Sequence, residues 1–226
     1  MVTTRSKYLS QLEEIDAMLG RFTEDTAQDI RTLAKALSGD ADAAQYVLDN
    51  AKTGRRLRDS IEDSCLDAML LQQPVAGDLR FLTGTFRLVS DIAHIDAKAG
   101  DVAELAQALP AEVTAKLGDH LAFAADRVAT MVEEAVEAFR TSDADRAHAA
   151  IAMDDDVDDV YLAAEGVVID LIKSSETRAK YLPELLMVAK YFERMGDDAV
   201  RIADWAVFRV TGVHEVHKDQ QGGNAE

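Results

Sequence analysis

Apolar side chains recur every three or four residues over long stretches of this chain. The clearest stretch lies near the N-terminus and contains Tyr8, Leu12, Ile15, Leu19, Phe22, Ile30, Leu33 and Leu37. Because an α-helix repeats every 3.6 residues, this spacing places the apolar side chains on one face of a helix. No stretch shows the strict alternation that is typical of a half-buried β-strand. The pattern therefore predicts an all-α fold.

Breaks in the apolar pattern divide the chain into six long helices. The breaks are Ser38-Gly39-Asp40, Gln73-Pro74, Leu109-Pro110, Ser142-Asp143 and Ser174-Ser175-Glu176-Thr177. The chain has only 12 glycines and 3 prolines in 226 residues. So few turn-forming residues argue against an all-β fold and against a Gly-rich nucleotide-binding fold. Long helices joined by short loops pack as antiparallel bundles.

A weak internal repeat groups the six helices in threes. When residue 93 is superposed on residue 193, the apolar positions that coincide are Ile95 with Met195, Ala99 with Ala199, Val102 with Ile202 and Ala103 with Ala203. This match aligns the third helix with the sixth. We therefore predict two tandem antiparallel three-helix bundles, residues 1–109 and 110–213. Residues 214–226 are polar, and we expect them to form a frayed tail.

The charge and cysteine content restrict the class of protein. With 42 acidic and 24 basic residues, the formal charge is −18, which disfavours nucleic-acid binding and attraction to an anionic membrane. The single cysteine, Cys65, excludes an internal disulfide and a Cys-ligated zinc site. No apolar run reaches the length of a membrane span, and the N-terminus lacks the apolar core of a signal peptide. We expect a cytoplasmic protein without membrane insertion.

Two acidic clusters are the candidate sites for chemistry. Asp154 and Asp158 are four residues apart in the fifth helix, and Glu193 and Asp197 have the same spacing in the sixth. Residues four apart share a helix face, so two such pairs on facing helices would form an all-oxygen cage. That ligand set suits Mg, Mn, Ca or iron. The alternatives are a solvated acidic helix start, and ion pairs of the second cluster with Lys190, Arg194 or Arg201.

Three motifs resemble the PhoU family of phosphate-signalling proteins. Glu193-Arg194-Met195-Gly196-Asp197 is similar to the family's signature Glu-Arg-Ile-Gly-Asp-x-x-x-Asn. Residues 74–80 resemble the Pro-x-Ala-x-Asp-Leu-Arg start of its third helix, and residues 154–158 resemble the Asp-x-x-Val-Asp start of its fifth. The resemblance spans about residues 4–212, and it implies two three-helix bundles with metal held by carboxylate pairs.

The resemblance implies metal ions in each bundle, but this chain keeps the ligands in the second bundle only. Its implied ligands are Asp154, Asp158, Glu193 and Asp197, with Arg201 where the family has asparagine. In the first repeat the matching positions are Ala51, Arg55, Ala93 and Ala97, so all four ligands are absent. We therefore expect a divalent or ferric ion (Mg, Mn, Fe or Zn) in the second bundle only. A rebuilt first site from His94, Asp96 and Asp101 is an alternative.

The implied function is control of phosphate uptake and signalling, not catalysis. The resemblance implies contacts with the phosphate ABC transporter ATPase and with a sensor histidine kinase, and the long helices would permit a homodimer. One alternative is a carboxylate-bridged metalloenzyme, but no candidate base or nucleophile accompanies the carboxylate cage. Another is a PhoU-like regulator of a different transporter or of an unrelated kinase.

Overall fold

The computed structural model describes residues 2–175 and 177–215, and all regular structure within these ranges is helical. The elements are α1 (Val2–Leu37), α2 (Ala41–Gln72), α3 (Ala76–Ala108), α4 (Ala111–Thr114), η1 (Ala115–Leu117), α5 (Gly118–Thr141), α6 (Ala144–Ala152), α7 (Asp154–Ser174), η2 (Ala179–Tyr181) and α8 (Leu182–Thr211). The predicted all-α fold is confirmed.

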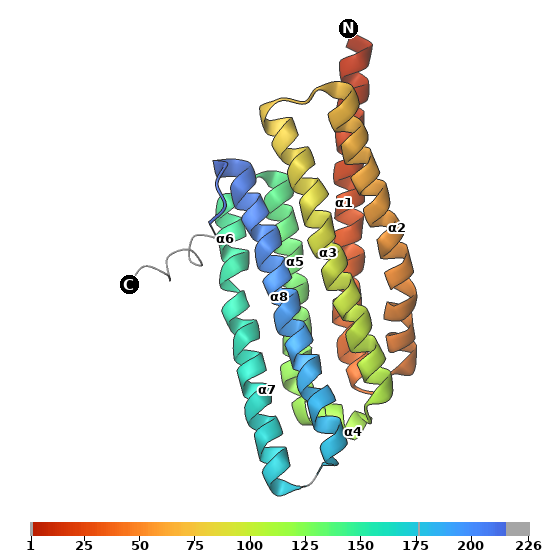
Figure 1. Ribbon diagram of the computed structural model, residues 1–226, viewed down its shortest axis with the longest axis vertical. Coiled ribbons are helices and arrows are strands. Elements are labelled where there is room, and N and C mark those ends of the chain that lie inside the picture. The colour runs from red at the N-terminus through yellow and green to blue at the C-terminus, as the bar shows by residue number, and fades with distance from the viewer. Residues whose placement is uncertain (1, 176, 216–226) are drawn as a thin grey trace, which may run out of the picture.

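The long helices pack as two antiparallel groups of three that lie side by side (Figure 1). In one group α1, α2 and α3 contact one another, and in the other α8 packs between α5 and the α6–α7 segment. The groups meet where α3 contacts α8 and α1 contacts α5. We call this line of contact the seam.

The helix ends lie at the predicted breaks, with two additions. Asp40 caps α2 by accepting hydrogen bonds from the backbone N–H groups of Asp42 and Ala43. One addition is η1, which separates the short α4 from α5, and the other is an interruption at Met153, which divides the predicted fifth helix into α6 and α7. The run Asp154-Asp155-Asp156 forms the first turn of α7. Negative side chains are favourable there, since the N-terminal end of a helix dipole is positive.

Small residues allow large side chains to enter the seam. The ring of Phe139, on α5, is fully buried against Gly84 of α3. A Cβ at position 84 would lie 2.5 Å from that ring, which is well inside van der Waals contact. Phe139 also stacks on Phe81 at a ring-centroid distance of 5.9 Å. The packing of the Phe139 ring against α3 therefore depends on the glycine.

The start of the predicted frayed tail is ordered, contrary to expectation. His214 Nδ1 lies 2.5 Å from a carboxylate oxygen of the buried Asp204, and the His214 ring stacks on Phe208. The backbone N–H of Glu215 donates to the other Asp204 oxygen at 2.8 Å. The prediction is therefore wrong for residues 214 and 215, because it missed the buried acceptor on α8. The remainder, 216–226, lies outside the described residues.

No helix in the described ranges is both long enough and apolar enough to cross a membrane.

We predict that Gly84→Ala destabilises the protein by about 1–3 kcal/mol, because the new methyl group must displace the buried Phe139 ring. The matched control is Gly100→Ala on the same helix, where an added Cβ meets nothing within 4 Å. That control should gain up to about 1 kcal/mol of helix propensity. Urea unfolding of both variants checks the prediction, and equal midpoints would contradict the packing argument.

Candidate metal centre

The two predicted carboxylate pairs meet where α7 packs against α8. Gly196 on α8 is buried, and a Cβ there would lie 2.5 Å from Asp154 Oδ1 and 3.6 Å from Val157 Cγ1. A glycine inside a helix costs about 1 kcal/mol relative to alanine. The cost has a physical reason here, because only glycine leaves room for the Asp154 carboxylate between the helices.

Two carboxylate oxygens at this contact are buried and have no hydrogen-bond partner, namely Asp154 Oδ1 and Glu193 Oε2. The pKa of Asp154 is raised to about 7, first by burial and then by the neighbouring carboxylates of Asp158, Asp197 and Glu193 in that order. The pKa values of Asp158 and Asp197 are also raised, first by burial and then by the other acids. All four predicted residues therefore act on one another electrostatically.

Nearby cations satisfy only part of this negative charge. Lys190 Nζ lies 2.5 Å from Glu193 Oε1 and 4.7 Å from the centre of the Tyr161 ring. Arg201 directs its guanidinium to Asp91 and Asp198. The ion-pair alternative is thus correct for one oxygen of Glu193, whereas Asp154 Oδ1 has no hydrogen-bonding partner.

The carboxylates are close but are not arranged as a formed metal cage. Within residues 2–175 and 177–215, no three His, Cys, Asp or Glu side chains are grouped so that they could hold one ion. Asp158 and Asp197 are exposed, whereas Asp154 and Glu193 are partly buried. Metal ligation by the four residues stays a prediction.

The first bundle has a different arrangement at the matching place. Asp96 of α3 is 6% exposed and packs over Gly54 of α2, where a Cβ would lie 2.7 Å from Asp96 Oδ2. In the first bundle the glycine therefore lies on the earlier helix, α2, and the acid on the later one, α3. In the second bundle the order is reversed, with the acid Asp154 on α7 and Gly196 on α8. His94 and Asp101 are exposed, so they do not share the buried position of Asp96. This placement gives the alternative site of His94, Asp96 and Asp101 no support.

Buried acids outside the predicted set were missed by the sequence analysis. Asp29 of α1 is 1% exposed and accepts a hydrogen bond from Asn50 Nδ2 at 2.7 Å. Its pKa is raised to about 7 by burial, an effect that Asn50 opposes and Asp96 and Asp25 reinforce. Asp29 precedes Leu33 by four residues, so it lies on the same apolar face of the first helix. That position was the signal from which its burial could have been predicted.

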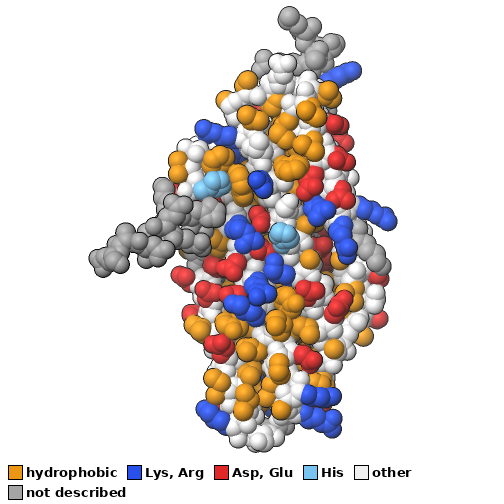
Figure 2. All heavy atoms as spheres, in the orientation of Figure 1, with side chains coloured by type: hydrophobic (Ala, Val, Ile, Leu, Met, Phe, Trp, Pro, Cys, Tyr) orange, Lys and Arg blue, Asp and Glu red, His pale blue; other side chains and the backbone are white. Residues whose placement is uncertain are grey.

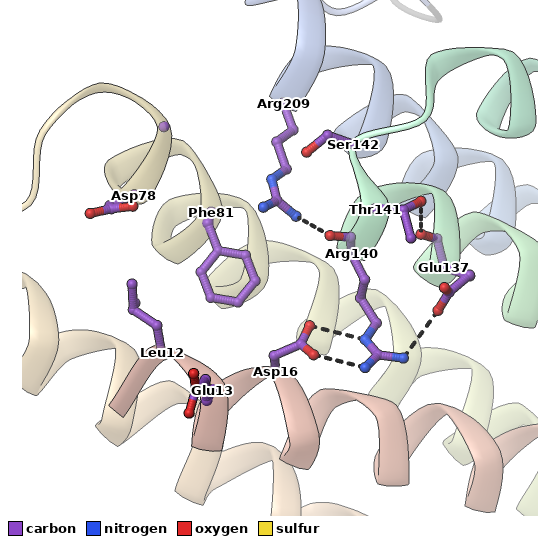
Figure 3. Close-up of a pocket in the computed structure, with 11 residues that line it drawn as sticks. Leu12, Glu13, Asp16, Asp78, Phe81, Glu137, Arg140, Thr141, Ser142 and Arg209 are labelled. Carbon is purple, nitrogen blue, oxygen red and sulfur yellow. Dashed lines mark hydrogen bonds and ion pairs between the residues drawn. The ribbon is translucent and has the colours of Figure 1, made fainter. Parts of the chain in front are cut away.

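A cavity of about 540 Å³ lies at one end of the seam, away from the four predicted ligands (Figure 3). On one side Arg140 donates two hydrogen bonds to the Asp16 carboxylate, at 3.0 and 2.7 Å. The Arg209 guanidinium lies over the rings of both Phe81 and Phe139 and donates to the backbone carbonyls of Phe139 and Arg140. These contacts satisfy carbonyls at the end of α5 and join the two bundles.

Fold and site together define a class: an all-helical double-bundle protein with carboxylates gathered between two helices of one bundle. The chain belongs to the PhoU family, since the PhoU domain model matches residues 18–106 and 121–206. This confirms the resemblance carried by the three motifs.

Individual relatives agree with the family assignment. The Clostridium acetobutylicum phosphate-specific transport system accessory protein PhoU homolog is 25% identical over 211 residues, which are 92% of this chain and 96% of that protein. The homolog from Synechocystis is 32% identical over 162 residues, 71% of each chain. The crystal structure of PhoU from Pseudomonas aeruginosa has a TM-score of 0.82 and 23% identity, covering 91% of this chain and 100% of that one. That last likeness concerns the fold alone.

We predict that Asp29→Asn stabilises the protein above pH 7 by about 1–3 kcal/mol. The pKa of Asp29 is higher in the folded state than in the unfolded state, so the folded protein binds the proton more tightly. The resulting cost of folding is absent below pH 4, grows between pH 4 and 7, and is constant above pH 7.

Urea unfolding of the parent and of Asp29→Asn at pH 5 and pH 8 checks this prediction. The difference in stability should be larger at pH 8. Asp25→Asn, at an exposed position on the same helix, is the control and should show a smaller effect. A difference that does not change with pH would contradict the assigned cause.

Proposed function

We propose that this protein is a metal-binding regulator of phosphate uptake and phosphate-responsive signalling, and that it is not an enzyme. It acts in the cytoplasm by contact with the phosphate ABC transporter ATPase and a sensor histidine kinase. Its relatives are named accessory proteins of the phosphate-specific transport system. The observation that carries the metal part is the pair of buried, unpartnered oxygens on Asp154 and Glu193.

The donor set fits a hard cation. Asp154, Asp158, Glu193 and Asp197 offer only carboxylate oxygens, which suit Mg, Mn, Ca or iron and can also bind Zn. When bound, such an ion supplies positive charge that offsets the repulsion among these acids. Asp154 and Glu193 would provide the buried oxygens from α7 and α8, and Asp158 and Asp197 would complete the set from the exposed side. The four matching positions of the first bundle lack acids, so we assign the metal to the second bundle.

A regulatory role is favoured over the metalloenzyme alternative by the surroundings of the carboxylates. Catalysis by a metal requires an open coordination position, a substrate pocket and a group that moves protons. The 540 Å³ cavity is lined from α1, α3, α5 and α8 by residues other than the four acids. The basic group next to the acids is Lys190, which is already held by Glu193.

The molecular surface is suited to protein contacts. Figure 2 shows one face, on which charged side chains of both signs gather in the middle and apolar side chains lie toward the ends. Where α2 turns into α3, Leu70, Leu71 and Val75 are each more than 70% exposed. Exposed apolar patches on soluble proteins often mark interaction sites. A partner protein or a second copy of the chain would cover such side chains.

We expect chelation to lower the thermal midpoint, and Mn²⁺ or Mg²⁺ to restore it. A ligand that binds only the folded state stabilises it by about 2.7 kcal/mol at 100 times its Kd. The double variant Glu193→Gln/Asp197→Asn should lose this response. It should also melt above the chelated parent, because two repelling charges are gone.

The control for this experiment is Asp170→Asn, which changes an exposed acid farther along α7. It should keep the full response to metal. A parent melting curve that neither chelator nor added metal shifts would overturn the metal part of the proposal and favour ion pairing as the only role of these acids.

The proposed contacts with the transporter ATPase and the sensor kinase predict a phenotype. A strain that lacks the protein should take up phosphate without normal control, and affinity capture from membranes should recover the phosphate transporter ATPase or a sensor kinase. Normal phosphate uptake and normal phosphate-responsive transcription in that strain would contradict this part. They would favour regulation of another transporter.

A further inference from the structure

Arg201 links the acidic cluster of the second bundle to the seam. It lies on α8, four residues after Asp197. Its Nε donates to Asp91 Oδ1 of α3 at 3.0 Å, and its Nη2 donates to Asp198 of its own helix. Lys98 of α3 approaches the other oxygen of Asp198 at 2.5 Å. Two cations and two acids thus alternate across the contact between α3 and α8.

This network is well shielded from water on its acidic side. The side chain of Asp198 is 4% exposed and that of Asp91 is 15% exposed, whereas Arg201 is 41% exposed. Interactions between partly buried charges are screened by salt less than those between exposed charges. The guanidinium is held at two points, so its position relative to α8 is restricted.

The same guanidinium also acts on the acidic cluster. Arg201 follows Asp197 by four residues on α8, so the two side chains lie on the same face of the helix. The charge of Arg201 is therefore next to Asp197 even though its hydrogen bonds go to Asp91 and Asp198. A positive charge fixed next to a carboxylate keeps the carboxylate ionised, and it also repels any further cation that approaches.

We propose that Arg201 is a built-in countercharge that weakens cation binding at the α7–α8 carboxylates and couples that binding to the α3–α8 seam. The inference rests on the proposed metal site. An ion at Asp197 repels the guanidinium and so favours the position in which Asp91 holds it away from the carboxylates. By reciprocity, whatever strengthens the hold of Asp91 on Arg201 favours the cation. The cation is of the hard, oxygen-binding class, and Mn²⁺ serves as its probe.

Titration calorimetry with Mn²⁺ at about 0.15 M salt tests the inference. Arg201→Gln removes the charge and should bind Mn²⁺ about tenfold more tightly, as expected for removing a unit charge from the neighbourhood of a divalent ion. Arg201→Lys keeps the charge but loses the fork of donors, and it should bind within about threefold of the parent. Asp91→Asn releases Arg201 from α3 and should weaken Mn²⁺ binding.

The matched control is Arg194→Gln, which removes an exposed arginine one turn from Asp197 on the other side. Solvent screening should limit its effect to less than about twofold. Circular dichroism verifies the fold of each variant. Asp91→Asn provides the test if Arg201→Gln does not fold, and unchanged Mn²⁺ binding in Asp91→Asn would overturn the coupling.

The outcomes separate the two proposals. If the parent binds Mn²⁺ and Arg201→Gln binds it no more tightly, the countercharge is overturned and the metal site stands. If Arg201→Lys differs from the parent as much as Arg201→Gln does, the fork of donors matters instead of the charge, and the inference is also overturned. A parent that binds no Mn²⁺ overturns the metal site itself.

Discussion

The burial of a carboxylate between α7 and α8 is the constraint on which the second bundle depends. Gly196 leaves space for the Asp154 side chain, and a methyl group there would lie 2.5 Å from its oxygen. Burying an acid without a partner is costly, because the charged form loses its hydration. Asp154 Oδ1 and Glu193 Oε2 both lack partners. The net charge of the protein is −18, and the proposed cation would offset the repulsion within this concentration of acids.

Both bundles contain buried acidic side chains, and they differ in the groups that can offset the buried charge. In the first bundle Asp96 packs over Gly54, Asp29 is paired with Asn50, and the positions that match the family's metal ligands hold no acid. The pKa of Asp96 is raised to about 6 by burial, and Arg55 opposes that rise. In the first bundle, a proton on Asp96 and the amide of Asn50 can thus offset the buried negative charge. The second bundle instead places four acids around one helix contact. The seam then joins both bundles through Arg140 and Arg201, which pair with Asp16 and Asp91 of the first bundle.

The helical fold could be predicted from the sequence, because helices and their ends depend on local patterns. Helical periodicity, helix breaks and the repeat were enough to predict six helices in antiparallel packing. The interruption at Met153 was not predicted, since the apolar period runs through it. The seam pairs Arg201–Asp91 and Lys98–Asp198 join residues about 100 positions apart. Such pairs depend on how the bundles dock, and no local pattern encodes that. His214 was placed in a frayed tail for the same reason, since its partner Asp204 could not be recognised as buried.

The most direct test of the central claim is elemental analysis of the protein purified without chelator. Parent protein should carry a divalent or ferric ion in stoichiometric amount, and Asp154→Asn, which removes the buried acid but keeps its shape, should carry much less. His94→Ala, in the first bundle, should match the parent. A parent that carries no metal, or a loss of metal in His94→Ala equal to that in Asp154→Asn, would contradict the assignment of the cation to the α7–α8 carboxylates.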